Sequence, residues 1–184
     1  MHRTALFLSF AVVLASAATA PAQTASPYVG QQQRSIKALS DQEVRDLTEG
    51  RGMGLAKAAE LNSYPGPMHV LELAGQLELS DTQRAATQSL RAIVRNKAPV
   101  LGARIIEAER DLDRAFAEGW IDAADLRSRT KAIAALQGEL RAVHLEAHLA
   151  QRVLLTAQQI ARYDELRGYR TAANPVEHRP RSHK

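Results

Sequence analysis

Residues 79–159 read LSDTQRAATQSLRAIVRNKAPVLGARIIEAERDLDRAFAEGWIDAADLRSRTKAIAALQGELRAVHLEAHLAQRVLLTAQQ. This stretch is rich in Ala, Leu, Arg, Glu and Gln, which are good helix formers. It has no run in which β-branched and aromatic residues alternate with polar ones, as they do in a strand. Its short break at residues 119–122 predicts two long helices, over about 81–118 and 123–154, that lie antiparallel.

Apolar residues on the two predicted helices recur at steps of three, four and seven, which places them on one narrow stripe of each helix. The stripes comprise Leu90, Val94, Leu101, Ile105, Leu112 and Phe116 on the first helix and Leu126, Ile133, Leu136, Leu140, Val143, Ala147, Ala150 and Leu154 on the second. Such a thin layer buries little core per residue, and dimerisation would bury more of it. We therefore expect a homodimer.

Helix starts are marked by capping boxes. In residues 40–43, 80–83 and 156–159, a Ser or Thr is followed three positions later by Glu or Gln. The hydroxyl can accept from a backbone N–H of the first turn, while the later side chain reaches back to the cap N–H. Asp122 and Asp125 form a weaker variant of the same pattern.

Shorter helices are expected around the long pair. Glycines at 50, 52 and 54 divide the segment after Ser40, and residues 62–67 form a turn rich in Pro and Gly. We predict a short helix over about 68–77 and a last helix over about 157–168. Pro99 should bend the first long helix, because it removes a backbone donor. The fold class is thus all-α, a long antiparallel helical hairpin with shorter flanking helices.

The two ends of the chain differ from this helical part. Residues 1–22 combine a basic start, an apolar core of about a dozen residues and an A-x-A site, which is typical of a secretory signal peptide; an uncleaved membrane anchor is the alternative. We expect a flexible segment over 23–38, the helical domain over 39–169 and a disordered basic tail over 170–184. Because of the predicted signal peptide, we expect the protein to be exported.

Composition excludes several classes of function. The net charge is +4 and aromatic residues are few, which argues against nucleic-acid binding. With no cysteine, thiol chemistry and thiolate metal sites are excluded. No Gly-rich phosphate loop or hydrolase motif is present, so we expect a protein that is not an enzyme and requires no cofactor.

Two capping boxes carry a resemblance to a known family. Leu79, Ser80 and Gln83, and again Leu155, Thr156 and Gln159, match an L-[ST]-x-x-Q motif. This motif occurs twice in the Spy/CpxP family of periplasmic chaperones and stress proteins, which includes zinc-resistance and heavy-metal-sensor branches. The resemblance covers about residues 50–170. It extends to residues 64–73, 148–155 and 163–169.

The resemblance implies a curved, usually dimeric cradle in the periplasm that binds unfolded or partly folded proteins without ATP. Arginines along the long helices, among them Arg91, Arg95 and Arg104, are candidates to contact acidic clients, while their stems and apolar neighbours meet hydrophobic ones. The alternative for each is an ordinary solvated helix face.

His144 and His148 stand four residues apart, so that both project from one helix face. Two imidazoles at this spacing can bind a divalent metal. Glu107 or Glu109 on the facing helix, or His69, would complete the set. In the metal-sensing branch such ligands bind zinc, nickel or cobalt, but that branch's N-terminal HxxxH has no counterpart here. Helix packing is the alternative role for His148.

These observations leave three candidate functions. The first is an ATP-independent periplasmic chaperone or envelope-stress protein. The second is a heavy-metal sensor or metal-binding resistance protein with the same fold. The third is a regulator that docks on a membrane sensor protein.

Overall fold

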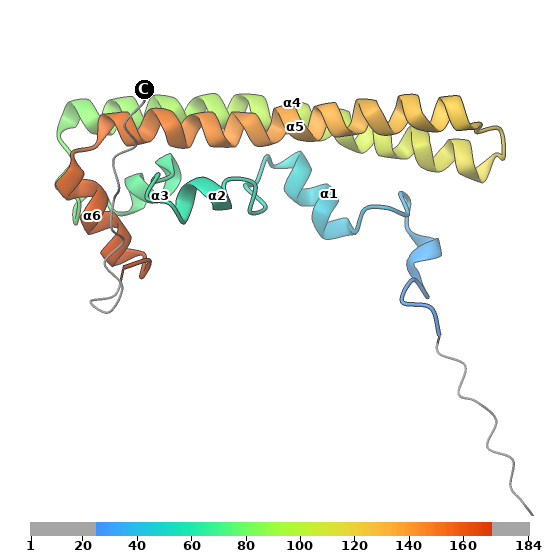
Figure 1. Cartoon of the computed structure of the whole chain (residues 1–184), viewed down its shortest axis with the longest axis horizontal. Coiled ribbons are helices and arrows are strands. Elements are labelled where there is room, and N and C mark those ends of the chain that lie inside the picture. Colours follow the sequence, from blue (N-terminus) through green and yellow to red (C-terminus); the bar gives the residue numbers. More distant parts are fainter. Residues whose placement is uncertain (1–24, 171–184) are drawn as a thin grey trace, which may run out of the picture. The chain divides into compact units, whose positions relative to one another are not determined.

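The structure is a computed structural model that describes residues 25–170. The predicted signal peptide and the predicted tail from residue 171 onward lie outside the described residues. The chain divides into two units, residues 1–32 and 33–184. In the first unit the described residues form a turn, in which the Val29 N–H donates to the Ser26 carbonyl at 3.1 Å. The second unit holds the α-helices (Figure 1).

Every regular element between residues 25 and 170 is helical, which confirms the all-α prediction. The elements are the 3-10 turn η1 (Gln31–Gln33) and the helices α1 (Asp41–Thr48), α2 (Lys57–Glu60), α3 (Pro67–Glu72), α4 (Asp81–Ala117), α5 (Ala123–Leu154) and α6 (Ala157–Leu166). The third helix ends at Glu72 rather than near residue 77. Within the same residues, no helix is long and apolar enough to cross a membrane.

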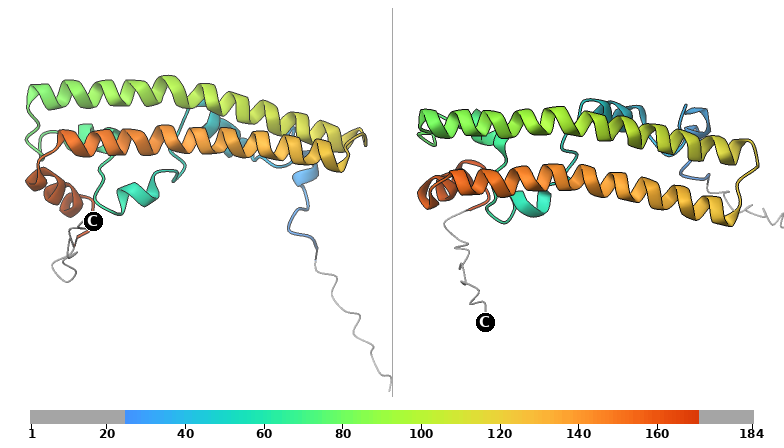
Figure 2. Two further views of the ribbon diagram at one scale, coloured as in Figure 1. Left: turned by 45° about the horizontal axis from the view of Figure 1, so that its top comes forward. Right: turned by 90° about the horizontal axis from the view of Figure 1, so that it is seen from above.

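The two long helices lie side by side and antiparallel (Figures 1 and 2). Near the start of α4, the side-chain amide of Gln83 donates to the Leu154 carbonyl at 2.8 Å. Further along, Arg104 and Glu139 approach to 3.8 Å across the pair. The chain reverses between the helices at Gly119, whose φ of +71° lies in the left-handed region that favours glycine.

Helix α1 approaches α4 closely at a glycine. A Cβ built on Gly102 would lie 2.0 Å from the carbonyl oxygen of Leu47, the last buried residue of α1. Gly50 makes a second close approach, 2.7 Å from its ideal Cβ position to Cδ of Pro99. α4 continues through Pro99 and curves gently (Figure 2). The proline and the glycine together shape the surface of α4 on which α1 rests.

Two separate apolar clusters form the core. The first comprises Ile36, Leu47, Ala98, Ile105, Ile106, Leu136 and Leu140. The second comprises Val70, Ala74, Leu77, Leu79, Leu155 and Tyr163. The predicted stripes are buried midway along the pair, but Phe116 and Leu126 near the turn are 57% and 37% exposed. The stripes thus lose their cover toward the turn.

The segment before α1 differs from the expectation of a flexible N-terminal stretch. Within it, Ile36 is 2% exposed and belongs to the first cluster. The neighbouring Lys37 ammonium lies 3.0 Å from the Asp113 carboxylate on α4. Residues 33–38 are therefore anchored to the long helices, because one apolar side chain and one ion pair hold them there.

Two glycine substitutions test the close approach of α1 to α4. Gly102→Ala should lower the free energy of unfolding by about 2 kcal/mol, since the new Cβ collides with the α1 backbone. Gly138→Ala, in the middle of α5 with open space at its Cβ position, should raise it by about 0.5–1 kcal/mol. Urea unfolding of both variants measures the difference. An equal change in the free energy of unfolding for the two variants would contradict the close approach of α1 to α4 at Gly102.

Candidate functional site

Both L-[ST]-x-x-Q motifs form helix caps. At the start of α4, the Gln83 N–H donates to the Ser80 hydroxyl at 3.2 Å, and the Ser80 N–H donates to Gln83 Oε1 at 3.0 Å. At the start of α6, Thr156 and Gln159 repeat the two bonds at 3.1 and 3.0 Å. Leu79 and Leu155, the first residue of each motif, are 8% exposed and share the second apolar cluster. The capping boxes were predicted, and they are confirmed.

The structure also brings the two motif glutamines together. Gln83 Nε2 lies 2.9 Å from Gln159 Oε1, and Gln159 Nε2 lies 3.1 Å from Gln83 Oε1. Each amide also donates to a backbone carbonyl, Gln83 to Leu154 at 2.8 Å and Gln159 to Leu77 at 3.1 Å. This reciprocal glutamine pair joins the starts of α4 and α6, so the role of the motif in this fold is structural.

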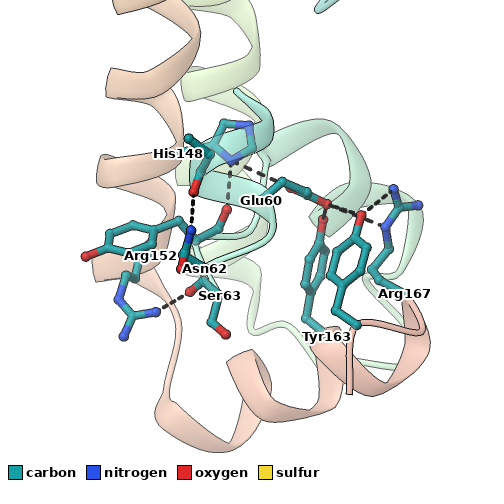
Figure 3. A network of polar contacts seen from close by, with 10 residues as sticks. Glu60, Asn62, Ser63, His148, Arg152, Tyr163 and Arg167 are labelled. Carbon is teal, nitrogen blue, oxygen red and sulfur yellow. Dashed lines mark hydrogen bonds and ion pairs between the residues drawn. The ribbon is translucent and has the colours of Figure 1, made fainter. Parts of the chain in front are cut away.

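A partly buried carboxylate, Glu60, contacts several polar groups at the same end of the molecule (Figure 3). The hydroxyl of Tyr163 donates to Glu60 Oε1, and the hydroxyl of Tyr169 donates to the same oxygen at 3.1 Å. Arg167 Nε lies 3.5 Å from that oxygen and forms an ion pair with it. Burial, followed by the bond to Glu60, raises the pKa of Tyr163, which keeps the phenol protonated as a donor.

The loop after Glu60 is fastened to α5 by two side chains (Figure 3). His148 Nδ1 lies 2.7 Å from the Tyr64 carbonyl, and because a carbonyl only accepts, this nitrogen carries the proton. Arg152 donates to the Ser63 carbonyl and stacks over the Tyr64 ring, 4.5 Å from its centroid. These contacts, with those of Glu60, connect α2, α5 and α6.

The predicted metal ligands are only partly brought together. His144 is 8% exposed, and its Nε2 has no hydrogen-bond partner among the described residues. In contrast, His148 Nδ1 is hydrogen-bonded to the Tyr64 carbonyl. Glu107 is exposed, pairs with Arg110 and lies far along α4. Within residues 25–170, no three His, Cys, Asp or Glu side chains are grouped to hold a metal. Among the described residues, the two histidines therefore lack the further protein ligands that a zinc site uses.

The three candidate arginines do not form one surface. Arg91 and Arg95 are one turn apart on α4, but Arg104 follows Arg95 by nine residues, which places it about half a turn around the helix. Arg104 also faces Glu139 on α5 at 3.8 Å. A client that contacts Arg91 and Arg95 would therefore not contact Arg104 on the same face.

An apolar groove lies where α4 and α5 meet. It has a volume of about 220 Å³ and is lined by Leu90, Ile93 and Lys97 from α4 and by Val143, Glu146, Ala147 and Ala150 from α5. We call it the open groove. Ile93 is 48% exposed, and Val100, two turns further along the same side, is 60% exposed.

The open groove lies on the face of the pair turned away from α1. On α4, Lys97 and Pro99 project about 200° apart, and Pro99 is on the side that α1 approaches. On α5, Glu146 and His148 are also two residues apart and project about 200° from each other. His148 faces the loop after Glu60, so Glu146 lies on the opposite side. Figure 2 shows this uncovered face in its right-hand view. Among the described residues, the open groove is therefore a surface that no other element covers.

Charges of opposite sign flank the open groove. Lys97 stands on the α4 side and Glu146 on the α5 side. Within residues 25–170 neither forms a salt bridge, whereas Arg104 and Glu139, further along, do. The α4 edge is thus positive and the α5 edge negative over this length.

Two features of the site were not predicted from sequence. Ile93 and Lys97 are outside the apolar stripe of α4, so the groove appears only when the register of α4 against α5 is known. The glutamine pair depends on α6 folding back onto the start of α4. The repetition of Gln at the fourth position after Leu was the only signal for that pair.

A double-mutant cycle tests the glutamine pair. Gln83→Ala and Gln159→Ala should each lower the free energy of unfolding by about 1–2 kcal/mol, because each leaves partly buried polar groups without a partner. The double variant should lose about 1 kcal/mol less than the sum of the single losses. Gln158→Ala, an exposed neighbour, serves as the control. Additive losses would show that the two amides act independently.

The stability of the fold should fall in mild acid because of His144. Its burial, and then the charge of His148, lower the pKa of His144 below the ordinary value of 6.5. The unfolded chain therefore takes up a proton first, and stability is lost as the pH falls below about 6.5. NMR titration of the imidazole and chemical unfolding between pH 7 and 5 measure both effects. An ordinary pKa for His144 would contradict its burial.

Comparisons with known proteins leave the family open. No protein-family model, no curated protein and no solved structure matches the chain. The resemblance to the Spy/CpxP family therefore rests on the sequence motifs, and membership stays a prediction. What the geometry adds is a structural role for both motifs and one uncovered apolar groove.

Proposed function

We propose that this protein is an exported, ATP-independent chaperone that binds partly folded proteins at the open groove. The observation that carries the proposal is the half-exposed apolar surface between α4 and α5, on the face that no described element covers. Burial of such surface by an aggregation-prone segment is favourable and needs no nucleotide. The resemblance to periplasmic chaperones points to the same activity.

The dimensions of the open groove support a protein client over a small molecule. Its volume of about 220 Å³ is below the range of about 300–1,000 Å³ that is usual for small-molecule pockets. A groove of this size accommodates a few apolar side chains of a client. Binding through few side chains is weak, so a client dissociates without an energy source.

Two alternatives make different predictions. For a metal-binding protein, the unpartnered Nε2 of His144 is the supporting observation, and zinc, nickel or cobalt would bind stoichiometrically and be lost in the double variant His144→Ala, His148→Ala. A regulator would use the open groove for a single membrane sensor protein and show no general client activity. Calorimetric titration with the three metals, on the sample used for client assays, separates these possibilities.

An aggregation assay tests the chaperone proposal. Residues 23–184 should suppress the aggregation of reduced α-lactalbumin in the absence of ATP. Ile93→Asp should reduce this suppression severalfold, because a charge in the groove opposes the burial of apolar client side chains. Leu149→Asp, the same change at a residue of α5 that is 55% exposed and outside the groove, should retain it.

Circular dichroism and thermal unfolding establish that both variants keep the fold. Client binding at the open groove would be refuted if the unaltered chain failed to suppress aggregation. It would also be refuted if the two variants suppressed aggregation equally.

A further inference from the structure

The open groove is lined at the spacing of a helix packing surface. On α4, Leu90, Ile93 and Lys97 follow one another at i, i+3 and i+7. Val143, Ala147 and Ala150 on α5 follow at i, i+4 and i+7, which also places them on one face, and the two alanines leave room for larger side chains. Side chains of a third helix can enter such a surface as knobs into holes.

The backbone chemistry of the groove distinguishes a helix from an extended segment. Both walls are α-helices, whose interior N–H and C=O groups are already paired within α4 and α5. An extended client segment would find no backbone partners there and would lose hydrogen bonds to water. A helical segment satisfies its own backbone, so it can bury an apolar face in the groove without this loss.

The edge charges define the flanks of that helix. Lys97 on one side and Glu146 on the other have no ion-pair partner among residues 25–170. An acidic side chain along α4 and a basic one along α5 would complement both, as charges beside the apolar positions of a coiled coil do.

We propose that the open groove takes an amphipathic helix of the client, which packs between α4 and α5 with an acidic flank along Lys97 and a basic flank along Glu146. This inference rests on the proposed function and names the class of segment that is bound. It predicts a preference for clients that retain helical structure.

Three synthetic peptides of about 18 residues, long enough to be partly helical, test this proposal. All carry the same leucine stripe; one has an acidic and a basic flank, one has two acidic flanks and one has two basic flanks. The mixed peptide should bind the full mature chain about fivefold more tightly than either of the others, since each of those places one flank against a like charge. Fluorescence anisotropy measures the three affinities.

Charge-reversal variants give the matched control. Lys97→Glu makes both edges acidic and should shift the preference to the basic peptide, while Glu146→Lys should shift it to the acidic one. The double reversal should restore the preference for the mixed peptide, because that helix can bind in the opposite direction. A merely structural effect of the substitutions would not restore it.

Three results would overturn the proposal. Equal binding of the mixed peptide and of a version whose helix is broken by central prolines would show that extended segments are recognised. Equal affinities for all three peptides would show that Lys97 and Glu146 do not contribute to recognition. A dimer seen by sedimentation and lost on Ile93→Asp would assign the groove to a second copy of this chain.

These results are distinguishable from failure of the proposed function. If aggregation is suppressed and Ile93→Asp abolishes the effect, the groove binds clients even where the helix preference fails. If Ile93→Asp leaves suppression unchanged, the proposed function at this groove fails first, whatever the peptides do.

Discussion

The antiparallel packing of α4 against α5 is the contact on which the rest of the structure depends. Two helices can bury only the stripes that face each other, so each side of the pair remains partly apolar. On one side α1, α3 and the segment around Ile36 supply the missing cover. The opposite side has no such cover among the described residues, and the open groove is the result.

The two sides of the pair use different interactions. The covered side relies on close approach, with Gly102 against Leu47, and on partly buried polar contacts around Glu60 that fix the short helices at one end. The uncovered side has small side chains, Ala147 and Ala150, between larger apolar residues. The first arrangement favours one fixed partner within the chain. The second can accept different side chains, because few contacts have to match.

Helix starts were predictable because capping is local. Ser80 and Gln83, or Thr156 and Gln159, are three residues apart, and their hydrogen bonds follow from sequence spacing alone. Contacts over long sequence separations were not predictable. The bond from Tyr163 to Glu60 joins residues that share no motif, and the Ile36 anchor lies in a stretch without helical periodicity. These contacts depend on how the short helices fold back.

The open groove likewise combines features that could be predicted from the sequence with features that could not. The apolar stripes identified residues buried between the helices and also part of the groove lining, whereas Ile93, Lys97 and Glu146 lie beside the stripes. Ile93 and Lys97 become groove residues because Val143 and Glu146 of α5 line the same groove. At one end of the pair, Gln83 ties α4 to α5 by donating to the Leu154 carbonyl. The motif that carried the family resemblance thus acts at a distance from the groove. Its Gln83 contacts both α6 and the last residue of α5, whereas the groove lies further along the two long helices.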